Sequence, residues 1–91
     1  MATNDNTVFV GRKGTMAYVL AVITQINQGA TEIYVKARGK AISRAVDVAE
    51  IVRNKFDTNL KIGNIAISTE EVQSEQGLPL KVSAIEITLK K

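Results

Sequence analysis

Apolar residues follow two different periods near the start of the chain, and each period predicts a different element. Thr7–Val10 is a short β-type run that ends before Gly11. From Thr15 the apolar positions take the i, i+3, i+4 spacing of a helix face, which predicts a helix with Thr15 as its N-cap and Gly29 just past its end. Its opposite side is apolar too, so we expect burial on more than one side. The predicted inner face is Met16, Val19, Leu20, Ile23 and Ile26, and the opposite side carries Ala17, Ala21 and Val22.

The middle of the chain repeats this order of strand and helix. Residues 32–37 alternate strictly, so Ile33, Val35 and Ala37 are predicted to face the core while the other face stays wet. A second helix is predicted over residues 40–56. Basic residues lie in its last turn, where their positive charge interacts favourably with the helix dipole. Its predicted inner face is Ile42, Ala45, Val46, Ala49 and Val52.

Two long strand-like runs, residues 60–72 and 80–90, complete the pattern. The apolar parity of the first run shifts at Gly63 and Asn64, which predicts a bulge. A polar loop at 73–77 predicts a long twisted hairpin whose tip projects from the body. The order β-α-β-α-β-β with right-handed crossovers predicts an α+β two-layer sandwich, with a mixed four-stranded sheet, both helices on one face and a protruding hairpin. Residues 1–6 are predicted to be a disordered tail and residues 7–91 a single domain.

The corner between the second strand and the second helix is strongly basic. Four cations with no acid among them lie between positions 36 and 44, with Gly39 at the joint. Such a corner exposes backbone N–H groups and the positive end of the helix dipole, which favour anions. A cation there opposes the dipole unless an anion binds, so the pattern predicts a site for the nucleic-acid backbone. The four cations are Lys36, Arg38, Lys40 and Arg44, of which Arg44 has an alternative partner in Asp47.

Charge is distributed unevenly along the 91 residues, whose formal net charge is +3. Between Arg12 and Arg44 there are six basic residues and one acid, Glu32. Residues 57–86 hold five acids and two lysines instead. The amino-terminal half is therefore predicted to form an electropositive surface, which is typical of a nucleic-acid binder.

The residues that are absent exclude several kinds of chemistry. The sequence contains no Cys and no His, which removes disulfides, thiolate chemistry and the commonest general base and metal ligand. No phosphate-binding glycine loop or nucleophile elbow occurs either, so we predict no enzymatic activity, cofactor or metal. No apolar run is long enough to span a bilayer and no secretory pattern occurs, which predicts a cytoplasmic protein. Aromatic residues make up 4%, and Phe9 and Tyr18 are predicted to pack rather than to stack on bases.

Three segments follow one another in an order that is typical of a known family: VFVGRKGTMAYVLA from Val8, VKARGKAISRAVDVAEIVRNKF from Val35, and VSAIEITLKK from Val82. They resemble the start of the first helix, the signature and the final strand of the Alba family of small archaeal chromatin proteins. The resemblance covers nearly the whole chain from Val8 onward. It implies a homodimer that coats and compacts double-stranded DNA with little sequence preference, is associated with the chromosome, and also binds RNA.

The resemblance also implies roles for individual residues. Basic residues of the first loop and of the corner would hold the nucleic-acid backbone, and the hairpins of a dimer would reach along the minor groove. The predicted nucleic-acid-binding residues are Arg12, Lys13, Lys36, Arg38, Gly39, Lys40, Arg44 and Lys81. Neighbouring dimers on DNA would contact each other cooperatively through Arg53, Asn54 and Phe56.

Three departures from the family pattern change these expectations. Arg12 stands where the family has a lysine; acetylation of loop lysine is a proposed switch in this family, so Lys13 is the remaining candidate for modification. Gly14 replaces a proline, which predicts a more mobile loop. The hairpin is acidic, which opposes its insertion into the minor groove; its acids are Glu70, Glu71 and Glu75.

Two other functions fit the same residues. A ribonucleoprotein subunit that binds structured RNA would use the same cations, because an A-form helix is recognised by shape and phosphates. A protein–protein scaffold would assemble through the apolar first helix, with its charge incidental. For the dimer, we expect the first helix and the last strands to form a two-fold interface.

Overall fold

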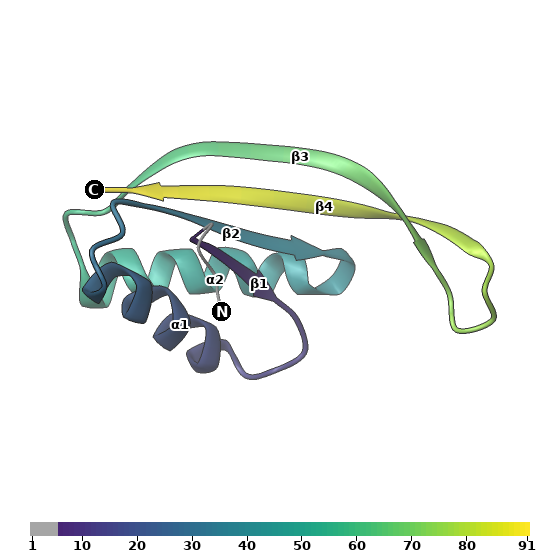
Figure 1. The fold of residues 1–91 in the computed structure, drawn as a ribbon, viewed down its shortest axis with the longest axis horizontal. Coiled ribbons are helices and arrows are strands. Elements are labelled where there is room, and N and C mark those ends of the chain that lie inside the picture. Colours follow the sequence, from purple (N-terminus) through teal and green to yellow (C-terminus); the bar gives the residue numbers. More distant parts are fainter. Residues whose placement is uncertain (1–5) are drawn as a thin grey trace.

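Four strands form one mixed sheet, and both helices pack on the same face of it (Figure 1). The computed structural model describes residues 6–91. β1 runs parallel to β2, and the other neighbouring strands are antiparallel, in the order β1-β2-β4-β3. The predicted fold class is confirmed. The strands are β1 (Thr7–Val10), β2 (Glu32–Arg38), β3 (Lys61–Gln73) and β4 (Pro79–Lys90).

The two helices follow the first two strands. α1 (Thr15–Asn27) follows β1, and α2 (Ile42–Ile51) follows β2. A 3-10 turn, η1 (Gly39–Ala41), leads into α2, and a π-helical turn, η2 (Val52–Phe56), continues it. The continuous helix predicted over 40–56 is therefore three segments with different hydrogen-bond spacing. Within residues 6–91 no helix is long and apolar enough to cross a membrane.

The hydrophobic core lies between the sheet and the helices. β2 supplies its centre, because the strict alternation of its residues turns every second side chain toward the helices, as predicted. Removing these apolar side chains from water supplies the main stabilisation of the fold. The buried core residues are Val8, Val10, Val19, Val22, Ile33, Val35, Ala37, Ala45, Val48, Ala49, Val52, Leu60, Ile87 and Leu89.

The start and the buried face of α1 differ from the prediction. Gly14, not Thr15, is the N-cap residue, and its backbone is extended (φ −63°, ψ 151°). Met16 and Leu20 are exposed, whereas Val22 is fully buried. Because Ala17 is exposed together with Met16 and Leu20, the predicted burial on more than one side is wrong for the single chain.

The buried face of α2 differs from the predicted face at two residues. Val46 is exposed and Val48 is fully buried, in contrast to the prediction. The residues that face the sheet are Ala45, Val48, Ala49 and Val52, which have the i, i+3, i+4, i+7 spacing of one helix face. At the other helix, Gly29 has a φ of +100° and follows the last turn of α1, as predicted for the C-terminal glycine.

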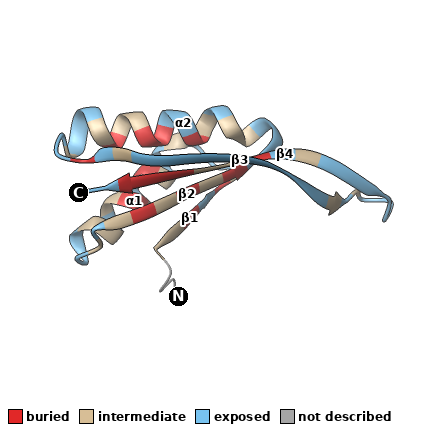
Figure 2. Ribbon diagram, turned by 90° about the horizontal axis from the view of Figure 1, so that it is seen from above, coloured by how far each residue is buried: buried red, intermediate tan, exposed pale blue. Residues whose placement is uncertain are grey.

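The predicted bulge and projecting hairpin are both confirmed. The register between β3 and β4 shifts between Ile62 and Ile65. Over residues 69–83, called here the hairpin arm, β3 and β4 pair only with each other and extend away from the body (Figures 1 and 2). None of the residues 69–83 is buried. The turn is organised by Ser74, whose Oγ accepts hydrogen bonds from the N–H groups of Gln76 and Leu78 (3.3 and 3.2 Å).

The predicted tail, residues 1–6, lies outside the described residues except for Asn6. The carbonyl oxygen of Asn6 accepts a hydrogen bond from the N–H of Tyr34 (2.9 Å). This bond extends the pairing of β1 and β2 by one residue at the start of β1.

Candidate nucleic-acid interface

The corner after β2 turns at Gly39, whose φ is +56°. Glycine adopts this left-handed conformation without the steric cost that a Cβ brings. Arg38 before it is extended, and η1 begins at once. In the described part of the chain, no side-chain hydrogen bond caps the start of η1 or of α2, and the N–H of Ile42, the first residue of α2, donates to the carbonyl oxygen of Gly39. The N–H groups at the start of η1 therefore have no side-chain partner at the turn that Arg38 and Lys40 flank.

Two hydrogen bonds hold the loop between β1 and α1 beside this corner. The Nη1 of Arg44 donates to the carbonyl oxygen of Gly11 (2.6 Å), which ties the loop to α2. The N–H of Lys13 donates to the hydroxyl of Tyr18 (3.0 Å). Arg44 is therefore a positioning residue for the loop, and its alternative pairing with Asp47 does not occur in the structure.

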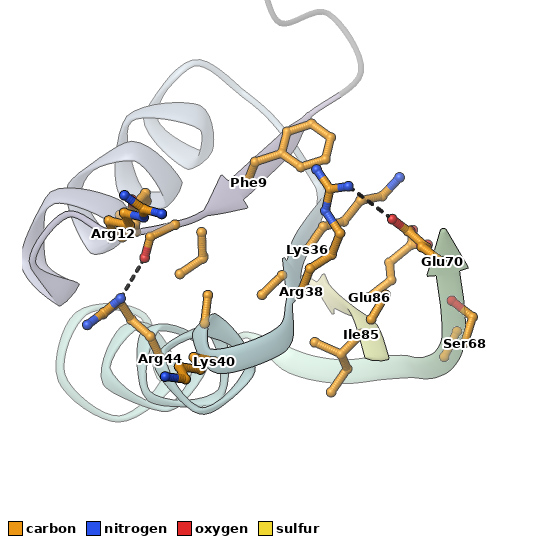
Figure 3. A pocket seen from close by; sticks show the side chains of 17 residues that line it. Phe9, Arg12, Lys36, Arg38, Lys40, Arg44, Ser68, Glu70, Ile85 and Glu86 are labelled. Atoms are coloured by element: carbon orange, nitrogen blue, oxygen red, sulfur yellow. Dashed lines mark hydrogen bonds and ion pairs between the residues drawn. The ribbon is translucent and has the colours of Figure 1, made fainter. Parts of the chain in front are cut away.

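A cleft of about 920 Å³ opens between this loop, the corner and the outer face of the sheet (Figure 3). Cations from the loop, β2, η1 and α2 line it, so segments far apart in the sequence contribute to one surface. Figure 3 shows Arg12 and Arg44 on one side of the cleft and Arg38 reaching toward Glu70 on the other. The lining cations are Arg12, Lys36, Arg38, Lys40 and Arg44, and the lining acids are Glu70 and Glu86.

Glu70 brings the acidic hairpin into the cleft. Its Oε1 lies 3.5 Å from the Nη1 of Arg38, and both side chains are about half exposed. An ion pair this exposed is weak, because water screens it. The sequence predicts only that the hairpin acids oppose insertion into the minor groove. It could not place Glu70 opposite Arg38, because that position depends on the bulge that sets the register of β3.

Phe9 lies in the same cleft, and its predicted packing role is wrong. Its side chain is 66% exposed on the face of the sheet that the helices leave open. The Nζ of Lys36, directly opposite in the register, lies 5.7 Å from the centre of its ring. The signal was present in the sequence: Val8 and Val10 face the core, so the residue between them faces outward. Tyr18, by contrast, packs against the core as predicted.

Other predicted site residues lie away from the cleft. Lys13 is exposed in the loop but does not line the cleft, and Lys81 lies on the hairpin arm opposite Glu71. Arg53 forms an ion pair with Glu50 (3.0 Å). Phe56 at the end of η2 is 52% exposed, which confirms the predicted exposure.

Glu32, the acid inside the basic half of the sequence, lies at the other end of β2 from the cleft. The hydroxyl of Tyr34 donates a hydrogen bond to it, and this bond lowers the pKa of Glu32 and raises that of Tyr34. The Nζ of Lys90 lies 3.5 Å from the other carboxylate oxygen and lowers the pKa of Glu32 further. The charge of Glu32 is therefore compensated locally, and it does not neutralise the cleft.

The fold and the site define a class: a small α+β sandwich with a cationic cleft where the parallel strand pair meets the starts of the two helices. The family model described as Alba matches residues 6–69. The chain therefore belongs to the Alba family. The resemblance of the three sequence segments is thereby confirmed.

Curated relatives agree with the family match. DNA/RNA-binding protein Alba of Methanocella arvoryzae is 59% identical over 96% of this chain and 91% of the relative. DNA/RNA-binding protein Alba 1 of Archaeoglobus fulgidus is 62% identical over 96% of this chain and 97% of the relative.

Solved structures agree as well. Alba from Thermoplasma volcanium superposes with a TM-score of 0.90 at 56% identity, covering 94% of this chain and all of that one. ALBA1 from Trypanosoma brucei superposes with a TM-score of 0.77 at 28% identity, covering 99% of this chain and 72% of that one. The sandwich is therefore shared with an archaeal and a eukaryotic protein.

Proposed function

We propose that the protein is a sequence-nonspecific double-stranded DNA-binding protein that coats and compacts chromosomal DNA as a homodimer, through phosphate contacts, and that it also binds RNA. The observation that carries this proposal is the cleft, where five cations from four segments meet and two acids oppose them. Clustered cations beside uncapped backbone N–H groups favour a polyanion over a neutral ligand. The relatives named above are DNA/RNA-binding proteins by name, which supports the same conclusion.

Lack of sequence preference follows from the kind of contact. The ammonium and guanidinium groups of the cleft would bind phosphates, and such contacts position a protein on the duplex without reading its bases. The hairpin arm carries three glutamates and one lysine, Lys81. We therefore assign most of the affinity to the cleft and Lys13 rather than to the arm. Lys13 is exposed in the loop and remains our candidate for a modification that removes a positive charge.

A homodimer accounts for the exposed apolar residues of β3. Ile65 and Ile67 lie opposite Ile87 and Ile85 in the register and so share the helix side of the sheet. Ile67 is nevertheless 79% exposed, because α2 packs over β1, β2 and β4. We assign the dimer interface to this part of β3. The sequence predicted the first helix together with the last strands, and α1 would contribute the exposed Met16 and Leu20.

The exposed Phe56 supports a second kind of contact, between dimers. It ends η2, and Asn54 of the same turn lines a shallow pocket of about 280 Å³ between α1 and α2. An exposed aromatic side chain is a suitable contact between neighbouring dimers on DNA, and such contacts would make binding cooperative.

Salt dependence of duplex binding tests the proposal. If a dimer contacts about 6–10 phosphates, affinity falls on the order of a thousandfold or more between 50 and 200 mM salt. Competition between duplex DNA and duplex RNA of equal length separates chromosomal coating from a role as a ribonucleoprotein subunit. Affinity that is nearly independent of salt contradicts the phosphate-contact mechanism. Sedimentation of a 9.9 kDa monomer at micromolar concentration contradicts the dimer.

The two candidate interfaces are separated by matched variants. Ile67→Lys on β3 is expected to dissociate the dimer, because it buries a charge in an apolar contact. Leu20→Lys on α1 is expected to leave it intact. The reverse pattern assigns the interface to α1.

A further inference from the structure

We infer that Phe9 is a stacking platform for an unpaired base of a single-stranded nucleic acid, whose neighbouring phosphates bind the cations of the same cleft. This inference rests on the proposed function and extends it from duplexes to single-stranded segments. It adds a base-contacting residue to a site that otherwise contacts phosphates alone. It gives a role to an exposed aromatic residue of the cleft that phosphate binding does not use.

The position of Phe9 is unusual for a phenylalanine. Two thirds of its surface is exposed, although three residues of the same strand are partly or fully buried. Across the open face of the sheet its row continues with Lys36, Glu86 and then Ala66. The next outward row contains Ala84 and Ser68, which also line the cleft. Lys36 is the neighbour of the ring in this row, and the small side chains of Ala66, Ala84 and Ser68 lie farther across the sheet, where the cleft is open.

The surrounding charges select the kind of flat ligand. The ammonium of Lys36 lies 5.7 Å from the centre of the ring, and Arg12, Arg38 and Lys40 line the same cleft. A base stacked on Phe9 therefore has cations within the same cleft for its phosphates. An apolar ligand without charge would not use them. Aromatic side chains on an open sheet face, flanked by cations, are a general way to hold single-stranded nucleic acid.

A duplex does not provide this ligand. Its bases are stacked on each other, so their faces are not available to a side chain, whereas an unpaired base exposes both faces. Phe9 is therefore expected to contribute to single-strand binding and not to duplex binding. This difference separates the inference from the proposed function, which concerns the duplex.

The chain contains no tryptophan, so Phe9→Trp introduces a unique fluorescent probe at this position. We expect uridine and thymidine 12-mers to quench its emission, and a 12-mer with abasic sites throughout to quench it much less, although its phosphates are the same. The uridine and thymidine arms show whether RNA or DNA is preferred. Quenching by the abasic strand to the same extent overturns the inference.

Affinity measurements provide the second readout. Phe9→Ala is expected to weaken binding of the uridine 12-mer by about tenfold or more, which is the usual effect of losing one stacked base. Phe9→Leu is expected to weaken binding of the uridine 12-mer similarly. It keeps a large apolar side chain, so the fold should be retained. Duplex affinity should change by less than about twofold in both variants, because the phosphate contacts are retained. Leu78→Ala, at an exposed apolar position on the hairpin arm, is the matched control.

Each outcome is decisive. If Phe9→Ala and Phe9→Leu weaken duplex and single strand equally, Phe9 shapes the cleft and does not stack. If neither variant changes single-strand affinity, or if sedimentation shows that Phe9→Ala dissociates the protein, the ring has another function. If the wild-type protein binds neither duplex nor single strand, the proposed function fails together with this inference.

Discussion

The cleft and the hairpin arm carry opposite charge, and they differ in how firmly the core anchors them. The cleft has five cations and two acids, and its loops are anchored to the core by the backbone of β2 and by Arg44. The arm has three acids and one lysine, and none of the residues 69–83 is buried. Binding groups need a rigid support to stay in position, and mobile segments have few buried contacts. The cleft is therefore the better support for the proposed phosphate binding, and the arm is suited to adaptable contacts.

The two regions meet at one ion pair, between Arg38 of the cleft and Glu70 of the arm. The arm therefore modulates the charge of the cleft as well as extending beyond it. Its position relative to the cleft depends on the register of β3 and β4, which the bulge between Ile62 and Ile65 sets.

The largest difference is expected in stability. Leu89 of β4 is fully buried in the body, whereas Leu80 of the same strand is exposed on the arm. Leu89→Ala is expected to lower the free energy of unfolding by about 2–5 kcal/mol, because it removes buried methyl groups and leaves a cavity. Leu80→Ala is expected to change it by less than about 0.5 kcal/mol. Urea unfolding at a fixed protein concentration measures both. An equal destabilisation of the two variants means that a partner covers the arm in the folded protein.

The second prediction concerns duplex binding. Arg38→Ala combined with Lys40→Ala removes two corner cations, and we expect affinity to fall by about tenfold or more at low salt. The slope of log affinity against log salt should decrease by about 0.9 for each phosphate that the variant no longer neutralises. Lys55→Ala combined with Lys61→Ala removes the same charge from exposed positions outside the cleft and is the control. If the control pair has the same effect, net charge and not the cleft determines binding.

The body was more predictable from sequence than the contacts between its parts. The alternation around Val35 and the glycine at position 39 are local signals, and the strand and the corner formed where they indicated. The buried face of α1 was mispredicted, because both of its sides are apolar and tertiary packing decides between Leu20 and Val22. The apolar side chain of Phe9 favours packing, whereas the alternation of β1 turns it outward. The ion pair of Arg38 with Glu70 could not be predicted from the sequence, because Glu70 comes from a distant strand after a register shift.

A smaller effect on stability is expected from two glycines, one in the corner and one in the arm. Gly39 in the corner and Gly77 in the arm both have positive φ, +56° and +80°, and a Cβ at either would meet open space. Alanine at either position is expected to cost about 1–2 kcal/mol of unfolding free energy, through backbone strain alone. Gly39→Ala should also weaken duplex binding, because relief of the strain moves Arg38 and Lys40. Gly77→Ala should leave binding unchanged, and weaker binding there would assign the arm a direct role.

The smallest effect is expected where the two regions meet. Glu70→Gln removes the charge that pairs with Arg38, so we expect duplex affinity at low salt to rise by a few fold, within the roughly 0–1 kcal/mol that exposed ion pairs contribute. Glu71→Gln makes the same charge change on the opposite face of β3 and should raise affinity less. In an Arg38→Ala background the effect of Glu70→Gln should shrink, because the coupling between neighbouring residues is then absent. Equal gains from Glu70→Gln and Glu71→Gln in both backgrounds would mean that the arm acts through its net negative charge, and that the ion pair between Glu70 and Arg38 has no separate effect on affinity.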